Sequence, residues 1–205
     1  MATDGARERR LDEIFGPVAA STHCDQALRA TVEEVVQLAV EIAREGREGR
    51  KIGTLFVVGD VERVVERSRP LLLDPLYGHA AELLGVRRPE FRETVKELAQ
   101  LDGAFVVDKH GVFVSAARYL DIDPRTPLLP GLGTRHAAAA SVTAETSSVA
   151  VVVSQSSIVR VYARGDIRAE VIPELFLLSR EGLFTPRANV RQVPEAGLTL
   201  AVADD

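Results

Sequence analysis

The sequence predicts a mixed α/β fold with a central β-sheet flanked by helices. Short apolar runs typical of buried strands alternate along the chain with segments whose apolar residues recur at helical spacing. The 205 residues, 46% hydrophobic and 27% charged, suit a globular domain of ordinary size with an added element. We expect a lead-in and amphipathic helix over residues 1–44, a central domain over 45–169 and a C-terminal extension over 170–205.

The first expected helix runs from about Cys24 to Arg44 and carries its apolar residues on one face. We expect that face to pack on the domain, and the helix to end at Gly46 or Gly49. Further helices are expected at 61–67 with Asp60 as N-cap, at 89–101 with a proline in the first turn, and in an alanine-rich segment that includes 137–140.

The apolar runs that predict strands are 54–58, 104–107, 112–115, 149–154 and 158–162. The second and third runs enclose a short polar turn, which is typical of a hairpin. Two segments that contain several Pro and Gly residues, 70–79 and 121–133, predict irregular structure. The pattern is weaker after residue 170.

Composition and charge exclude several classes of protein. A net charge of −5 argues against a general nucleic-acid-binding surface, although a local basic pocket for a small anion is compatible with it. No apolar run is long enough to cross a bilayer, and the N-terminal residues lack the apolar core of a secretory signal. Cys24 is the single cysteine, so no intramolecular disulfide forms. We expect a cytoplasmic protein with no nucleic-acid or membrane partner.

One glycine-rich turn opens the alanine-rich helix and carries groups suited to phosphate. Its residues are Gly133, Thr134, Arg135 and His136. Free backbone N–H groups and the positive end of a helix dipole attract an anion at such a position. Arg135 adds a planar cation, and His136 adds a donor, a proton carrier or a metal ligand. Taken alone, an Arg-His pair at a helix start is more often surface capping.

A second motif, Asp102-Gly103-Ala104, stands just before a predicted strand. Its carboxylate can hold a divalent cation or accept a proton, and a nucleotide site explains both motifs together. Taken alone, an Asp-Gly pair is most often a turn. Asp121 and Asp123 stand beside a proline-containing loop and are interpreted as turn formers, because no further ligands stand at a regular spacing.

With Val153-Ser154 before the last strand, these motifs resemble the diadenylate cyclase domain, first described in the DNA-integrity scanning protein. The resemblance runs from about Glu45 to Gly165. The upstream segments 44–49, 53–60 and 68–71 are similar to the archaeal-type branch of this family.

The resemblance implies condensation of two ATP molecules into cyclic di-AMP with release of two pyrophosphates, dependent on Mg²⁺ or Mn²⁺. In the family each domain holds one ATP and two domains meet face to face, which implies a dimer or higher homo-oligomer. It also implies that Asp102 lies near the attacking hydroxyl and the metal, with His136 at the phosphates or the metal. The other nucleotide-binding positions it implies are Gly103, Ala104, Gly133, Thr134, Arg135, Ser154 and Gln155.

Two residues depart from the commoner pattern. Many bacterial members carry Arg where this chain has Ala137, and many carry Glu where it has Gln155. One change removes a cation from the expected phosphate site, and the other replaces a carboxylate by a poorer metal ligand. A non-catalytic protein that binds adenine nucleotides or cyclic di-AMP on the same fold is therefore the alternative. A structural module that uses the N-terminal helix as its interface is a third hypothesis.

Overall fold

The computed structural model describes residues 25–71, 73–126 and 131–173, together with strands at 188–193 and 198–203. Its centre is a seven-stranded sheet of order β2-β4-β3-β1-β5-β6-β7. β1 and β3 are parallel, and the other neighbouring strands are antiparallel. The strands of this sheet are β1 (Thr54–Val58), β2 (Ser68–Pro70), β3 (Ala104–Val107), β4 (Phe113–Leu120), β5 (Val149–Val153), β6 (Val159–Ala163) and β7 (Asp166–Val171).

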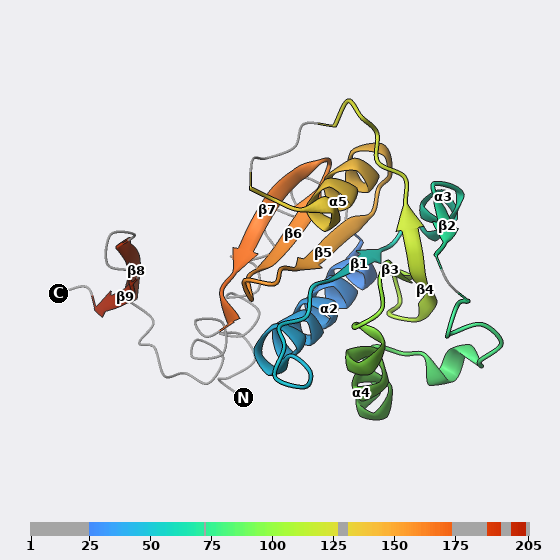
Figure 1. Ribbon diagram of the computed structural model, residues 1–205, viewed down its shortest axis with the longest axis horizontal. Helices are drawn as coiled ribbons and strands as arrows, with labels where there is room; N and C mark the ends of the chain where they lie inside the picture. Colours follow the sequence, from blue (N-terminus) through green and yellow to red (C-terminus); the bar gives the residue numbers. More distant parts are fainter. Residues whose placement is uncertain (1–24, 72, 127–130, 174–187, 194–197, 204–205) are drawn as a thin grey trace.

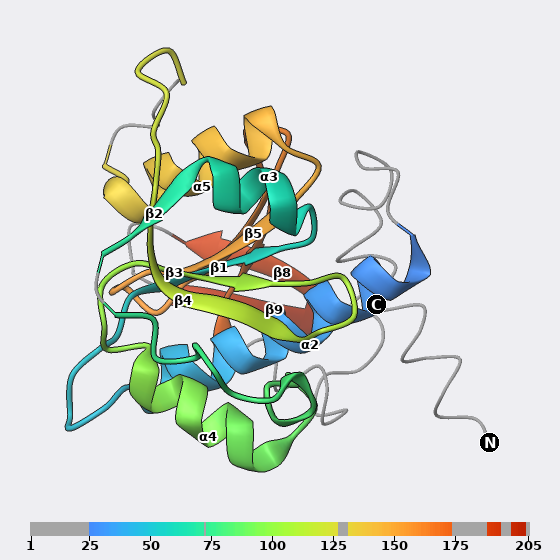
Figure 2. The ribbon, with the colours of Figure 1, turned by 90° about the vertical axis from the view of Figure 1, so that its right-hand side faces the viewer.

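Helices cover both faces of the sheet, so the fold has three layers (Figures 1 and 2). The helices are α2 (Gln26–Glu45), α3 (Val61–Glu66), the short 3₁₀ helix η1 (Ala81–Leu83), α4 (Pro89–Leu98) and α5 (Thr134–Glu145). α2 and α4 lie on one face, and α3 and α5 lie on the other. This arrangement confirms the mixed α/β fold predicted from the alternation of apolar patterns.

α2 packs along the sheet, as its apolar face predicts. Ten of its residues are buried, and the nine apolar ones share one hydrophobic cluster with strands β1, β5 and β6. The Asp25 side chain caps the helix by accepting a 2.8 Å hydrogen bond from the N–H of Leu28. The helix ends at Gly46, whose positive φ of +58° glycine adopts without strain.

On the opposite face, α5 packs against the sheet through alanines. Ala138, Ala139 and Ala140 are buried in a cluster with Leu55 of β1 and Val152 of β5. Side chains this small let the helix axis lie close to the strands. The N-terminus of α5 is thereby held near the edge of the sheet where β1 and β3 begin.

The structure differs from the sequence predictions at several points. Asp60 precedes α3 as expected, but its side chain does not cap that helix; it accepts hydrogen bonds from the N–H and hydroxyl of Ser147 at 2.8 and 3.0 Å. β4 extends to Leu120, five residues beyond the predicted end, with a bulge in its pairing and Ala117 at a φ of +53°. β2 and β7 were not predicted.

Beyond residue 173 the structure describes two strands, β8 (Ala188–Val193) and β9 (Leu198–Ala203), which form an antiparallel pair of their own. The predicted lead-in before residue 25 and the rest of the C-terminal extension lie outside the described residues. The division of the chain at residues 44 and 169 stays a prediction. Among the helices described, none combines the length and apolarity needed to cross a membrane.

Candidate functional site

Strand register places three loops side by side at one edge of the sheet. Leu55 of β1 pairs with Ala104 of β3, and Thr54 pairs with Val153 of β5. Because β1 and β3 are parallel and β5 runs the other way, the residues just before β1 and β3 lie at the same edge as those just after β5. The predicted motifs at Asp102 and Ser154 are therefore brought together, although they are far apart in sequence.

Close packing against β4 explains why position 103 is a glycine. Its φ is +102°, and a Cβ at this position would lie 2.6 Å from the carbonyl carbon of Ala117 and 2.7 Å from the amide nitrogen of Arg118. Contacts this short are not tolerated between backbone atoms and a side chain. Only glycine fits here, so the motif residue fixes the approach of two neighbouring strands. Contact of its backbone with a nucleotide stays a prediction.

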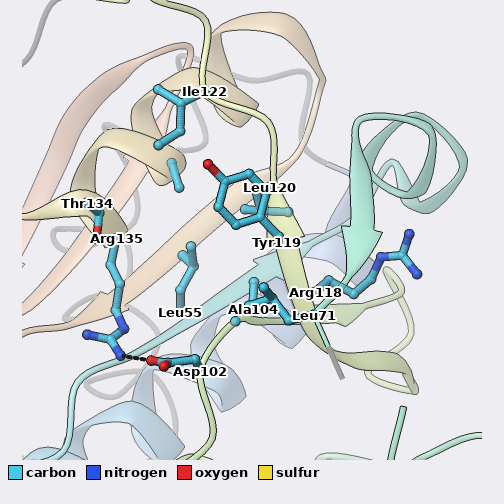
Figure 3. A pocket seen from close by; sticks show the side chains of 12 residues that line it. Leu55, Leu71, Asp102, Ala104, Arg118, Tyr119, Leu120, Ile122, Thr134 and Arg135 are labelled. Atoms are coloured by element: carbon cyan, nitrogen blue, oxygen red, sulfur yellow. Dashed lines mark hydrogen bonds and ion pairs between the residues drawn. The ribbon is translucent and has the colours of Figure 1, made fainter. Parts of the chain in front are cut away.

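Arg135 and Asp102 face each other across this edge. The guanidinium Nη2 of Arg135 lies 3.2 Å from Oδ1 of Asp102, and Figure 3 shows the two side chains meeting from opposite elements. The Asp102 side chain is 86% exposed and that of Arg135 35% exposed. An ion pair this exposed adds little to the free energy of folding, so both groups are available to a ligand.

Gly53 is a site residue that sequence reasoning did not single out. A Cβ built on it would lie 3.1 Å from Nη1 of Arg135, 3.3 Å from the carbonyl oxygen of Val153 and 3.5 Å from Cγ of Gln155. The guanidinium of Arg135 therefore lies over bare backbone between two loops. The signal in the sequence was the glycine directly before a buried strand, which marks close approach by another group.

His136 is buried and turned toward the sheet, not exposed at the helix start. Its Nδ1 lies 3.0 Å from the hydroxyl oxygen of Tyr162 on β6. Desolvation, reinforced by the nearby charge of Arg160, lowers the pKa of His136 to about 4. Burial raises the pKa of Tyr162 to about 12, so at neutral pH the pair is a neutral imidazole and a protonated phenol.

Two pockets adjoin Thr134 and Arg135. The first, the apolar pocket, has a volume of about 380 Å³ and lies over β1, β3 and β4 (Figure 3). Aliphatic side chains and the ring of Tyr119 supply much of its wall, and Asp102 lies at its rim. Its lining residues are Leu55, Leu71, Asp102, Gly103, Ala104, Arg118, Tyr119, Leu120, Ile122, Thr134, Arg135 and Ala138.

The second pocket, the basic pocket, has a volume of about 290 Å³ and lies at the N-terminus of α5. It contains the predicted residues His136, Ser154 and Gln155, and also Arg160 of β6, which the sequence analysis missed. Among its described lining residues there are two arginines and no carboxylate. The lining is Gly131, Leu132, Gly133, Thr134, Arg135, His136, Val152, Val153, Ser154, Gln155, Ser156 and Arg160.

Ser154 shapes the loop that borders this pocket. Its hydroxyl accepts a hydrogen bond from the N–H of Ile158 at 3.1 Å and lies 3.0 Å from the carbonyl oxygen of the same residue. The hydroxyl of Ser156 is 2.8 Å away. Ser154 thus closes the turn between β5 and β6, and Gln155 is exposed beside it. Direct contact of either side chain with a nucleotide stays a prediction.

The described residues contain no group of three or more His, Cys, Asp and Glu side chains that could hold a metal ion. The predicted ligands, Asp102 and His136, would therefore act with oxygens from a bound ligand. Mg²⁺ is commonly held in this way, by one or two carboxylates and the phosphates of a nucleotide. Asp123 is engaged by Arg125, whose hydrogen bonds hold its pKa at about 2, in agreement with a role in the turn.

Comparisons with known proteins identify relatives of this chain. Residues 41–167 match the family described as DisA bacterial checkpoint controller nucleotide-binding. A diadenylate cyclase from Methanocaldococcus jannaschii is 44% identical over 155 residues, which is 75% of this chain and 49% of that protein. A diadenylate cyclase from Haloferax volcanii is 36% identical over 147 residues, 71% of this chain and 54% of that protein. The chain thus spans about half the length of the curated relatives it matches.

A solved structure supports the fold independently of sequence. The crystal structure of a hypothetical membrane-spanning protein from Bacillus cereus superposes with a TM-score of 0.51 at 21% identity. The match covers 67% of this chain and 62% of that one. At this level of identity the likeness concerns the fold alone.

Proposed function

Because the chain belongs to the family of the DisA bacterial checkpoint controller nucleotide-binding domain, we propose that it condenses two ATP molecules into cyclic di-AMP. The observation that carries the proposal is the Asp102–Arg135 pair, which stands between an apolar and a basic pocket. A nucleoside triphosphate needs those two environments side by side, one for the base and one for the phosphates. The diadenylate cyclase relatives make ATP the substrate to test first.

In this proposal the adenosine occupies the apolar pocket. Leu55, Leu120 and Ile122 offer an apolar wall, and the exposed ring of Tyr119 offers a face on which a base can stack. The triphosphate occupies the basic pocket, where the first N–H groups of α5 and the guanidinium of Arg135 neutralise its charge. Arg135 and Thr134 line both pockets, so they lie where the sugar joins the phosphates.

The reaction joins two such half-sites. The 3′-hydroxyl oxygen of one ATP forms a bond to the α-phosphorus of the other, and the bond between the α-phosphorus and the bridging oxygen of pyrophosphate breaks. The hydroxyl proton leaves as the new ester forms. Asp102, at the rim of the apolar pocket, lies where its carboxylate can attract that proton. The same transfer in the opposite direction closes the ring and releases the second pyrophosphate.

Two further features belong to the proposal. Mg²⁺ or Mn²⁺, when bound through Asp102, His136 and phosphate oxygens, would neutralise charge on the phosphates. Since one chain holds only one ATP, the mechanism requires two copies face to face, in a dimer or a higher homo-oligomer. We place the protein in the cytoplasm, with ATP as substrate and without a nucleic-acid or membrane partner.

Incubation of the purified protein with ATP and Mn²⁺ or Mg²⁺, followed by chromatography of the products, tests the activity. We expect cyclic di-AMP and pyrophosphate in a ratio of one to two. ATP binding without any product would instead support the alternative, a non-catalytic nucleotide-binding protein. Ala137 and Gln155 favour that alternative, because neither adds a charge beside the residues proposed to bind phosphate and metal. No binding and no product would contradict both.

A further inference from the structure

Arg160 lies on the same face of the sheet as His136 and the start of α5. Strand register sets this position, because Arg160 is two residues before Tyr162 on β6 and side chains two apart point to the same face. Tyr162 is bonded to His136 in the first turn of α5. Arg160 also lies opposite Val152 of β5, which lines the basic pocket. Register and pocket lining therefore place Arg160 beside the predicted phosphate-binding turn.

Glu170 restricts the orientation of the Arg160 side chain but engages only one of its three guanidinium nitrogens. Register pairs it with Glu170 of β7, and its Nε donates to the carboxylate of that residue. The side chain is only 14% exposed, so its orientation is restricted. Within the part of the chain that the structure describes, no hydrogen bond engages its two terminal nitrogens. These are the atoms that bind phosphate oxygens bidentately.

One arginine alone would leave much of the charge of a triphosphate in the basic pocket without a partner. Ala137, which follows His136 in α5, supplies no charge. An ATP triphosphate brings several negative charges into a pocket whose other cation is Arg135. Arg160 reaches the same pocket from a different element of the fold. The charge of Arg160 also acts on His136, because it adds to the lowering of the pKa of His136 that desolvation causes.

We propose that Arg160 binds the triphosphate of ATP as the second cation of the basic pocket, with Glu170 holding its guanidinium over that pocket. This inference rests on the proposed function. It predicts that loss of Arg160 weakens binding of phosphate groups and leaves recognition of the adenosine intact. If the ion pair between Arg160 and Glu170 were only structural, loss of either residue would weaken binding to the same extent, and it would do so for ATP and adenosine alike.

Calorimetric titration of the full chain with ATP and with adenosine separates these roles. For Arg160→Gln we expect the dissociation constant of ATP to rise about tenfold to a hundredfold, the range of one charged hydrogen bond, with that of adenosine unchanged. Glu170→Gln should bind ATP within about twofold of the unaltered chain, because the cation remains and the amide oxygen can still accept the hydrogen bond from Nε of Arg160. Arg160→Lys should recover part of the loss, since it keeps the charge without the planar fork.

Three controls make the outcomes distinct. Arg168→Gln removes an arginine on β7 that pairs with Asp166 outside the basic pocket, and it should leave ATP affinity unchanged. Arg135→Ala should weaken ATP binding in any case. Melting temperatures identify a variant that has lost its fold. If Arg160→Gln is such a variant, Arg160→Lys is compared with the unaltered chain instead, and a weaker binding of ATP with unchanged binding of adenosine is expected.

Equal ATP affinity in Arg160→Gln and the unaltered chain would overturn the inference while leaving the proposed function standing. Equal losses in Arg160→Gln and Glu170→Gln, for ATP and adenosine alike, would also overturn it, in favour of a structural ion pair. Failure of the unaltered chain to bind ATP would overturn the proposed function itself.

Discussion

The imidazole Nδ1 of His136 lies 3.0 Å from the hydroxyl oxygen of Tyr162, inside the layer between α5 and the sheet. With Nδ1 engaged, Nε2 is the atom of His136 left for the basic pocket, which this residue lines. A second partner at one ring nitrogen is the usual means of fixing the orientation of an imidazole that acts through the other. Tyr162 is therefore a positioning residue for His136.

Replacement of Tyr162 by Phe removes the hydroxyl and keeps the ring. We expect the rate of cyclic di-AMP formation to fall about tenfold and the Mn²⁺ concentration for half-maximal rate to rise, because the imidazole is no longer held. Product formation is measured over a series of Mn²⁺ concentrations. Tyr77→Phe, at a residue 89% exposed, is the control and should have no effect. An unchanged Mn²⁺ dependence in Tyr162→Phe would show that His136 does not need this partner.

Burial of His136 makes folding stability depend on pH. Its pKa is about 4 in the folded chain, against an ordinary value of 6.5. Between these values the unfolded chain binds a proton that the folded chain does not, so the free energy of unfolding falls as the pH is lowered from about 6.5 to about 4. Urea denaturation at a series of pH values measures this slope. His136→Asn should give a shallower slope, and parallel slopes would contradict the prediction.

Asp102→Asn keeps the shape of the side chain and removes its charge. We expect it to abolish cyclic di-AMP formation and to change ATP affinity only modestly, since the phosphates are bound by other residues. Turnover and calorimetric binding are measured on the same preparation. Asp166→Asn is the matched control, because Asp166 is also an exposed carboxylate that pairs with one arginine, outside both nucleotide pockets. Surviving turnover in Asp102→Asn would remove the carboxylate from the mechanism.

Gly53→Ala tests the position of Arg135. The new methyl group crowds the guanidinium of Arg135, and we expect this flexible end of the Arg135 side chain to move. The rate of cyclic di-AMP formation should fall about tenfold or more, and the melting temperature should change little. Gly85→Ala, where a Cβ meets only an ordinary contact from Arg88, is the control. In an Arg135→Ala background, Gly53→Ala should have no further effect. Additive losses in the double variant would mean that Gly53 acts independently of Arg135.

Most of the fold could be predicted because burial leaves a periodic pattern in the sequence. The strand Thr54–Val58 and the helix α2 were predicted to within two residues, since both place nearly all their apolar residues in the core. β7 (Asp166–Val171) was missed because strands were predicted from continuous apolar runs, whereas this edge strand alternates charged with apolar residues and has one buried residue. β4 was predicted too short, because its bulge at Ala117 interrupts the strand pattern.

The candidate site was predictable where it lies in continuous motifs. Asp102 and Arg135 were expected to lie close together, and the structure pairs them. Gly53, Tyr162 and Arg160 were not expected at the site, because each reaches it through strand register, which no local pattern encodes. His136 was expected to face a ligand, and its burial depends on a tyrosine far along the chain.

The pair between Asp102 and Arg135 also has a consequence for ligand binding. Without a ligand, the Asp102 carboxylate is paired with the guanidinium of Arg135, which is the group proposed to bind phosphate. An anion that engages the guanidinium of Arg135 would compete with Asp102 for the same cation, so its binding would release the carboxylate from the ion pair. Departure of the anion would restore the pair. Binding of a ligand at Arg135 and release of Asp102 are therefore two sides of one exchange of partners.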